Sequence, residues 1–596
     1  MSKLKGANFI ERAIDKNEVF IPEEFTEEQI MIKDMVEDFC IKEIQEPILK
    51  RGRELYATND DDRKEIETLL EKSAELGLCG VAIAERFGGM DLDFNTGLVF
   101  SEAIAAGFSF ATTVGAQTSI GSLPIVYYGT EEQKAKYLPG VANASIKAAY
   151  ALTEPSAGSD ANSGKSKAVL SEDGKHYILN GQKMWITNGG FAHIFIVFAK
   201  IEDDQNLSAF IVEKAFGGVT IGAEEKKLGI KGSSTVQVFF NDCKVPVENL
   251  LSERGKGFKI ALNILNSGRI KLAAGTTGGS KFAITKAVLY AIEREQFGQS
   301  IADFGAMKYK IAEMTTKTFT CDSAVYRTGK NIDLKTEEFV KNGMDSSEAK
   351  LKALREFAIE CAILKVKGSD NLDYVVDEAL QIHGGMGYSV ETGIEMGYRD
   401  ARITRIYEGT NEINRLLSVA ELGKRAVVSK ELDLKKAGKK IPGQLLKKLL
   451  PFNHENDFEI ISNMKSIFLL LLDATGRKYR EKLEFEQEIV LNLSNLLAEA
   501  FVAESAFLRV QKLKDVQGFD QEKLDVMKAM VKINIYNALA IVRNSSKEII
   551  DTYATGFEKK KMFYLVKLLT KKYDVNPTAL RRKIADYVIK EKAYCF

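Results

Sequence analysis

The chain has 596 residues, of which 83 are basic and 83 acidic, so its formal net charge is zero. A chain of this length divides into several domains, and a neutral chain has no overall field that attracts nucleic acid or an anionic membrane. Hydrophobic residues make up 45% of the sequence, and no continuous run approaches the roughly 18 apolar residues of a membrane-spanning helix. The composition indicates a multidomain globular protein, and any contact with nucleic acid or a membrane must come from a local patch of charge.

The cysteines and histidines lack the spacing of disulfide or metal sites. The six cysteines include no CxxC pair, and the four histidines form no HExxH or i,i+4 pattern. We therefore expect free thiols and no metal site. The first twenty residues carry Glu11, Asp15 and Glu18 and no continuous apolar core, unlike a secretory signal or a transit peptide. These features favour a reducing cytoplasm as the location.

Residues 1–148 read as an N-terminal helical domain. Thr26 and Gln29 have the spacing of a helix-starting capping box, and so do Thr130 and Gln133. Pro139 and the glycine after it are expected to end the second of these helices. From about residue 149 to 256 the apolar pattern alternates with period two, between Gly, Asn and Asp turns, which predicts a compact β domain of several short strands.

The helical period returns at residue 257 and continues to about 426, which predicts a helical bundle. Residues 427–454 are lysine-rich and interrupted by Pro442 and Pro451, so we expect a linker or an amphipathic segment there. Residues 455–596 predict one more helical domain, without a recognisable catalytic grouping. The fold class is therefore mainly α with a central β domain, and a cleft is expected where the β domain meets the helices.

Two strings of small and polar residues lie in the expected β domain. Residues 150–160 read YALTEPSAGSD, whose small side chains let backbone N–H groups approach an anionic or carbonyl-bearing ligand. Residues 180–190 read NGQKMWITNGG, which places Trp185 and Thr187 on one face of a strand. An indole wall beside a hydroxyl suits a flat heterocycle. Either string alone also describes an ordinary turn or a core tryptophan.

Three further strings lie in the second helical region. Residues 294–298 read REQFG and offer an arginine that either pairs with a pyrophosphate or stays solvated. Residues 381–388 read QIHGGMGY and follow a helix rather than a strand, which excludes a Rossmann dinucleotide loop. Residues 405–415 read RIYEGTNEINR and place Glu408 just before a helix start, where a carboxylate also simply favours the helix dipole.

Together, in this order and on this helical, β, helical layout, the five strings closely resemble the acyl-CoA dehydrogenase family over about residues 25–425. The continuation into a further helical region, with NILNSGRI at 263–270, is most similar to the very-long-chain branch. The resemblance implies a helical domain, a β-barrel or sandwich and a four-helix bundle, followed here by an extra C-terminal helical domain.

The resemblance also implies site residues and the cofactor FAD. Glu408 matches the catalytic base, which removes the α-proton of an acyl-CoA while the β-hydride passes to the flavin. Positions that match FAD contacts are Thr153, Ser159, Trp185, Thr187, Arg294, Phe297, Gln381, Gly384, Gly385, Thr410 and Glu412. Positions assigned to the substrate are Tyr150, Ser159, Arg269, Tyr407 and Gly409. Glu412 departs from the family at a position that is often Gln.

Five of the matched positions, in the strings REQFG and QIHGG, hold the FAD of a neighbouring subunit in the family, which implies a homodimer or larger homo-oligomer. The implied reaction is α,β-dehydrogenation of a fatty acyl-CoA to trans-2-enoyl-CoA in β-oxidation, with electron-transfer flavoprotein as the acceptor. An α-hydrogen of a thioester is a very weak acid, so burial must raise the pKa of Glu408 against the opposing helix dipole.

Short local patterns predict the acyl-chain length of the substrate and a contact with the membrane. Small residues at Thr118, Ser119, Gly121 and Ser122 predict room for a long acyl tail, although small residues also permit close helix packing. Residues 434–450 pair leucines with lysines, which is typical either of a segment on the inner membrane face or of a solvated linker. An acyl-CoA oxidase and a scaffold protein that keeps this fold stay open as alternatives.

Overall fold

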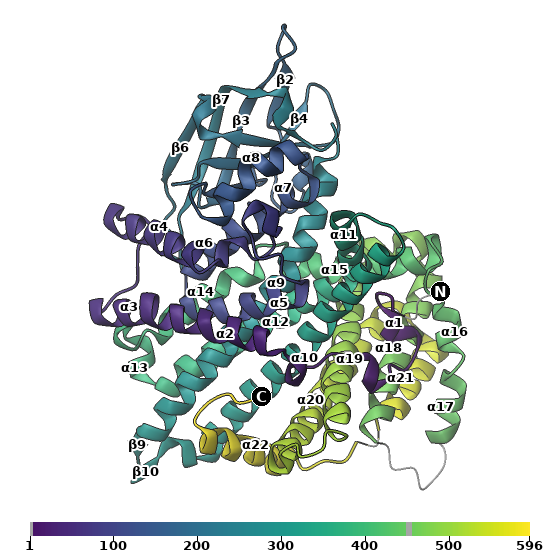
Figure 1. The fold of residues 1–596 in the computed structure, drawn as a ribbon. Helices are drawn as coiled ribbons and strands as arrows, with labels where there is room; N and C mark the ends of the chain where they lie inside the picture. The colour runs from purple at the N-terminus through teal and green to yellow at the C-terminus, as the bar shows by residue number, and fades with distance from the viewer. Residues whose placement is uncertain (1–3, 449–455, 572) are drawn as a thin grey trace.

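The computed structural model describes residues 4–448, 456–571 and 573–596. Figure 1 shows the β domain at one end of the molecule, N-terminal helices below and beside it, and long helices that run away from it. The helices at the C-terminal end of the sequence pack along one flank of these long helices, beside α10. The order helical, β, helical, helical is the one that the sequence predicts.

The N-terminal region is helical, and both expected capping boxes form. The helices are α1 (Asn8–Glu11), α2 (Glu27–Phe39), α3 (Glu46–Arg51), α4 (Asp60–Glu75), α5 (Phe94–Ala103), α6 (Phe110–Gly115), α7 (Leu123–Tyr128) and α8 (Glu131–Ala142). Thr26 and Thr130 each accept a hydrogen bond from the backbone N–H three residues on, so α2 and α8 begin as predicted. The expected stop at Pro139 is wrong, because α8 continues to Ala142 with Leu138 and Val141 buried on either side of the proline.

The β domain is an eight-stranded sheet in the order β6-β7-β3-β2-β4-β5-β8, with β1 parallel to β4. Its strands are β1 (Ala148–Ala151), β2 (Lys167–Leu170), β3 (His176–Thr187), β4 (Ile194–Ile201), β5 (Ser208–Glu213), β6 (Val219–Glu224), β7 (Thr235–Pro246) and β8 (Leu250–Leu251). The register of β3 against β7 shifts between Lys183 and Ile186, and Trp185 has φ 57°. The regular pairing of β3 with β7 is therefore interrupted at Trp185, two residues before Thr187.

Four long helices form the bundle next to the β domain. They are α9 (Gly257–Glu293), α10 (Gly305–Lys341), α12 (Ala358–His383) and α15 (Asn411–Gly423), and α12 contacts each of the other three. Shorter elements connect them: β9 (Glu295–Gln296), β10 (Gln299–Ser300), α11 (Ser346–Glu356), α13 (Gly385–Tyr388) and α14 (Ile394–Ala401). The residues between α14 and α15 include Glu408, so the bundle carries the expected catalytic loop.

The segment after the bundle is more ordered than a solvated linker. It contains a π turn (Lys424–Val428), α16 (Leu434–Gly438) and α17 (Ile441–Lys448). Leu432, Ala437 and Ile441 are buried in the core, whereas Leu446 is 68% exposed. Residues 449–454, which include the end of the expected amphipathic stretch, lie outside the described residues.

The C-terminal domain is helical, as predicted. It consists of α18 (Asp457–Tyr479), α19 (Gln487–Leu513), α20 (Gln521–Tyr553), α21 (Gly556–Thr570) and α22 (Pro577–Glu591). Among the described helices, α19 alone is long and apolar enough to cross a membrane, but 83% of that stretch is buried inside the molecule. We therefore describe α19 as a core helix of this domain.

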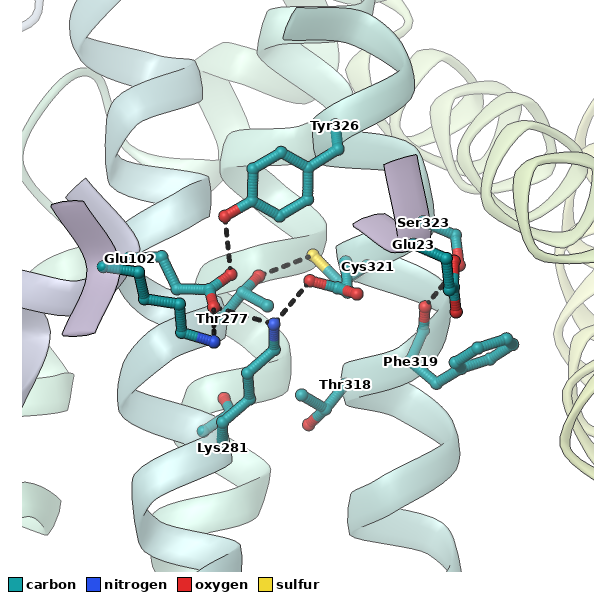
Figure 2. A network of polar contacts seen from close by, with 12 residues as sticks. Glu23, Glu102, Thr277, Lys281, Thr318, Phe319, Cys321, Ser323 and Tyr326 are labelled. Atoms are coloured by element: carbon teal, nitrogen blue, oxygen red, sulfur yellow. Dashed lines mark hydrogen bonds and ion pairs between the residues drawn. The ribbon is translucent and has the colours of Figure 1, made fainter. Parts of the chain in front are cut away.

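A buried polar network joins the three helical regions (Figure 2). Glu102 of α5 accepts hydrogen bonds from Lys281 of α9 at 2.8 Å and from Tyr326 of α10 at 2.7 Å. Lys281 also binds Asp322 at 2.7 Å, and Asp322 in turn accepts from Arg509 of α19 at 2.7 Å. Paired charges are tolerated in a protein interior because each has a partner. The network fixes α5, α9, α10 and α19 relative to one another.

Candidate active site

One apolar cavity of about 370 Å³ lies between the N-terminal helices and the bundle. One face of α9 forms its wall from Gly268 to Lys286, through Leu272, Gly275 and Gly279. This wall follows five turns of helix, roughly 27 Å. Helices α5, α6 and α14 line other sides of the cavity, and Glu408 lies beside Gly268. A cavity of this size and character is typical of a small-molecule site.

The loop that carries Glu408 has an unusual backbone conformation and is held by hydrogen bonds from α15. Glu408 has φ 58°, a left-handed conformation that is uncommon for a residue with a side chain. The carbonyl groups of Glu408, Gly409 and Thr410 accept hydrogen bonds from Nδ2 of Asn414, at 3.3, 2.8 and 3.1 Å. Thr410 caps α15 by accepting from the N–H of Ile413. Asn414 therefore stabilises the conformation that directs Glu408 into the cavity.

The carboxylate of Glu408 is poorly solvated. Its Oε2 atom is buried and has no hydrogen-bond partner in the described part of the chain. A Cβ atom at Gly268 would lie 2.5 Å from Oε2, so only glycine leaves room for the carboxylate at this point of α9. Burial raises the pKa of Glu408 to about 7, although the charges of Arg269 and Lys365 oppose this shift. A base with a pKa near the working pH combines availability with proton affinity.

Two cations near Glu408 are themselves held by amide side chains. Arg269 donates through Nη1 to Asn266 at 2.8 Å and through Nε to the backbone oxygen of Glu408 at 3.4 Å. Lys365 donates to Asn411 at 2.7 Å, and burial lowers the pKa of this lysine to about 8. Neither of these two described cations donates a hydrogen bond to Oε2 of Glu408. The carboxylate thus keeps the high proton affinity that burial confers.

The structure brings several predicted residues together. Thr187 at the end of β3, Tyr407 and Glu408 all line the cavity. The hydroxyl of Tyr150 is buried without a hydrogen-bond partner in the described residues, and both burial and the nearby charge of Glu408 raise its pKa. Arg269 lies beside the loop, and Gly409 has the left-handed φ of 82° that the turn requires.

Other predicted residues lie outside the cavity. Trp185 is 62% exposed, and Thr153 is partly exposed. Surface positions are also found for Ser159, Arg294, Phe297, Gln381, Gly384, Gly385 and Glu412, whereas Thr410 is partly buried at the start of α15. Phe297 is 94% exposed at the turn between β9 and β10. Their assignment as FAD contacts stays a prediction.

The four small residues expected around an acyl tail divide between the cavity and the packing beside it. Thr118 and Ser119 line the cavity, but Gly121 and Ser122 are not among its lining residues. A Cβ atom at Gly121 would lie 2.7 Å from the carbonyl oxygen of Ala116. The glycine therefore serves close packing, which is the other explanation that small residues allow.

Sequence reasoning missed Gly268, Lys365 and Asn414. Glycine in the interior of a helix costs about 1 kcal/mol relative to alanine, so Gly268 within the 37-residue α9 is a detectable sign of close approach. Asn414 is in the same string as Glu408. No local signal marks Lys365, because its bond to Asn411 joins residues 46 positions apart.

Comparisons with known proteins agree with this geometry. Models of the N-terminal, middle and C-terminal domains of acyl-CoA dehydrogenase match residues 26–145, 149–243 and 255–423, and a second model of an acyl-CoA dehydrogenase C-terminal domain matches residues 463–568. A probable acyl-CoA dehydrogenase of Bacillus subtilis is 39% identical over 99% of this chain and 98% of its own length. The rat mitochondrial very long-chain specific acyl-CoA dehydrogenase is 43% identical over 63% of this chain and 56% of its own.

A solved structure shares the whole architecture. The crystal structure of acyl-CoA dehydrogenase complexed with FAD from Bacillus anthracis has a TM-score of 0.94 and 39% identity, over 99% of this chain and 100% of that one. The agreement includes the extra C-terminal helical domain, because the match spans both chains almost completely. The domain matches, the full-length relative and the shared fold show that this chain belongs to the acyl-CoA dehydrogenase family of oxidoreductases.

Proposed function

We propose that this enzyme dehydrogenates a long-chain fatty acyl-CoA between Cα and Cβ, giving trans-2-enoyl-CoA in fatty acid β-oxidation, with Glu408 as the base. The observation that carries the proposal is a buried carboxylate, with a pKa of about 7, at the wall of an apolar cavity. A desolvated carboxylate without a hydrogen-bond partner costs free energy of folding, and a protein with only a scaffold role would gain nothing from that cost.

FAD is the cofactor bound in the Bacillus anthracis structure, and Thr187 is the predicted FAD contact that lines the cavity in this chain. Thr187 on the β-domain side and Glu408 on the bundle side line the same space, and the buried hydroxyl of Tyr150 lacks a partner in the described residues. FAD would supply the acceptor for the β-hydride. The chain itself supplies the base: Oε2 of Glu408 takes the α-proton, and the apolar walls exclude water from it.

Preference for a long acyl chain rests on the shape of the cavity. Its wall follows α9 for roughly 27 Å, well beyond the length of a short acyl group, and the small side chains of Thr118 and Ser119 also line it. Several relatives are very long-chain specific acyl-CoA dehydrogenases, which supports the same preference.

We also infer a homodimer or a larger homo-oligomer. Arg294, Phe297, Gln381 and Gly384 lie exposed around the ends of α9 and α12, where a second subunit would cover them and bring its FAD. Electron-transfer flavoprotein is the proposed acceptor, in preference to oxygen. Separation by size with light scattering tests the assembly, and transfer of electrons to purified electron-transfer flavoprotein tests the acceptor.

For location we propose the cytoplasm, with peripheral contact at the inner face of the membrane. The helices α17 and α21 contact each other and expose Leu446, Phe557 and Tyr564, at 68%, 81% and 57%. Lysines accompany these apolar side chains on both helices, a combination that suits an anionic lipid surface. Co-sedimentation with vesicles of anionic and of neutral lipid tests this contact, and equal binding to both would contradict it.

The experiment that tests the function is anaerobic titration of the purified enzyme with palmitoyl-CoA and with octanoyl-CoA, followed by flavin absorbance. We expect rapid bleaching by palmitoyl-CoA and little by octanoyl-CoA. Fast recovery of the colour in air would identify an oxidase instead. No bleaching by either compound, in protein that contains FAD, would overturn the proposal.

A further inference from the structure

One carboxylate of α12 binds residues on both sides of the loop that carries Glu408. Asp370 forms an ion pair with Arg405, before the loop, at 3.3 Å, and accepts a hydrogen bond from Asn411, after the loop, at 2.8 Å. Arg405 also donates a hydrogen bond to Asp373 of α12 at 2.9 Å. Arg415, one turn further along α15, donates to the other oxygen of Asp370 at 2.6 Å. Charged hydrogen bonds of this kind are stronger than neutral ones and fix geometry. The position of Glu408 therefore depends on where Asp370 and α15 lie.

The C-terminal domain reaches this arrangement through α19. Oδ1 of Asn495 accepts from Nε of Arg415 at 3.1 Å, and the hydroxyls of Ser494 and Ser418 lie 2.9 Å apart. Both contacts join α19 to α15, the helix whose first turn carries Asn411 and Asn414. Lys367 of α12 also binds Glu499 of α19 at 2.7 Å. The C-terminal domain thus contacts the two helices that hold the catalytic loop.

From these contacts we infer that the C-terminal domain takes part in catalysis, with Asn495 as a positioning residue for the catalytic base. Asn495 holds the guanidinium of Arg415 against Asp370, so that Asp370 stays aligned with Arg405 and Asn411. Asn411 in turn keeps the ammonium group of Lys365 in place near Glu408. The inference rests on the proposed function, because it assigns Asn495 a role only if Glu408 is the base.

An amide suits this task better than a carboxylate. Arg415 already has Asp370 as its ionic partner, so the neutral oxygen of Asn495 orients the guanidinium without competing for its charge. Because a displacement of about 1 Å at a reacting group can lower a rate by 10²-fold, loss of one orienting bond is expected to be measurable.

The test compares Asn495→Ala with Asn492→Ala in the full-length enzyme with FAD bound. Asn492 lies on the same helix, but its amide binds Glu488 and Glu548 within the C-terminal domain. For Asn495→Ala we expect flavin reduction by palmitoyl-CoA to slow about tenfold at saturation, with little change in the acyl-CoA concentration for half-saturation. The apparent pKa of the rate should rise, because a displaced loop lies further from Lys365. Asn495→Asp keeps an acceptor for Arg415 and should recover much of the rate.

Two results would overturn the inference while leaving the proposed function intact. One is an Asn495→Ala enzyme with the rate and pH profile of the wild type. The other is an equal loss in both variants, with equal losses in thermal midpoint, which would mean that the C-terminal domain stabilises the fold and no more. If instead the wild type were not reduced, or Glu408→Gln were reduced as fast as the wild type, the proposed function would fail and this inference with it.

Discussion

The pKa shifts of two glutamates in this molecule have opposite signs: Glu102 is buried, and Glu408 is partly buried with its Oε2 atom shielded from solvent. Burial raises the pKa of both Glu408 and Glu102, but the charges of Lys281 and Lys33 outweigh burial at Glu102 and lower its pKa to about 2. At Glu408 the charges of Arg269 and Lys365 do not outweigh burial, and the pKa rises to about 7. Glu102 accepts hydrogen bonds from Lys281 and Tyr326 (Figure 2), whereas Oε2 of Glu408 has no such partner in the described part of the chain.

The difference shows how one residue type serves two purposes. A carboxylate surrounded by donors stays charged and ties helices together, as at the junction of α5, α9 and α10. A carboxylate that is buried but left without donors holds its proton more tightly and can accept one from a weak carbon acid. At Glu408, the proposed base, Oε2 lacks the hydrogen-bond donors that Glu102 has, within the described residues.

The largest expected effect is that of Glu408→Gln. The amide keeps the shape of the side chain but cannot take a proton, so flavin reduction by palmitoyl-CoA should slow by on the order of 10³-fold. FAD content and binding of acyl-CoA should stay near the wild-type values. Stopped-flow absorbance under anaerobic conditions measures the rate, with Glu421→Gln on α15 as the matched control. Reduction of the variant at the wild-type rate would remove Glu408 from the mechanism.

Glu102→Gln should instead weaken the fold and leave the chemistry intact. Removal of one partner from a buried ion pair costs about 3 kcal/mol, and thermal unfolding at pH 7 measures the loss. Because the folded pKa of Glu102 is below the unfolded value of 4.5, its stabilisation is present above pH 4.5 and is lost as the pH falls towards 2. The difference in stability between the variant and the wild type should therefore become smaller as the pH falls. A difference in stability that becomes larger as the pH falls would contradict this account of the network.

Gly268→Ala should displace the carboxylate without changing its chemistry. The added Cβ would lie 2.5 Å from Oε2 of Glu408, so the side chain must move, and flavin reduction should slow by roughly tenfold or more. Gly423→Ala on α15 meets nothing within 4 Å and serves as the control. Equal rates in the two variants would show that the contact between Gly268 and Glu408 does not position the base.

The smallest expected effect concerns stability and pH. Because the folded pKa of Glu408, about 7, lies above the unfolded value of 4.5, its contribution to stability is complete below pH 4.5 and is lost as the pH rises through 7. The side chain of the Glu408→Gln variant does not titrate, so the variant does not lose this stability. The thermal midpoint of the variant minus that of the wild type should therefore increase by a few degrees between pH 5 and pH 8. A relative midpoint that is constant over this range would mean that the pKa of Glu408 is not raised.

Local patterns predicted most of the elements and the position of Glu408 before a helix start. Capping boxes at Thr26 and Thr130 begin helices, and Glu408 lies just before the cap of α15, because these features depend on residues a few positions apart. The failure at Pro139 has the opposite cause. Buried neighbours carry α8 past the proline.

Long-range contacts in the site could not be predicted from the sequence. Arg415 and Asn495 are 80 positions apart, and Lys365 and Asn411 are 46 apart, with no periodicity or spacing that connects them. The family resemblance named Arg269 near the base, but it gave no role to Lys365, Gly268 or the C-terminal domain. These residues gain their roles only when the helices are packed together.

The pH dependence of anaerobic flavin reduction by palmitoyl-CoA tests the central claim most directly. If Glu408 is the base in the free enzyme, the second-order rate constant should rise with pH through an inflection near 7 and then level off. The inflection should be absent from the residual rate of Glu408→Gln. A rate that does not change between pH 5.5 and 9, or the same inflection in the variant, would contradict the account.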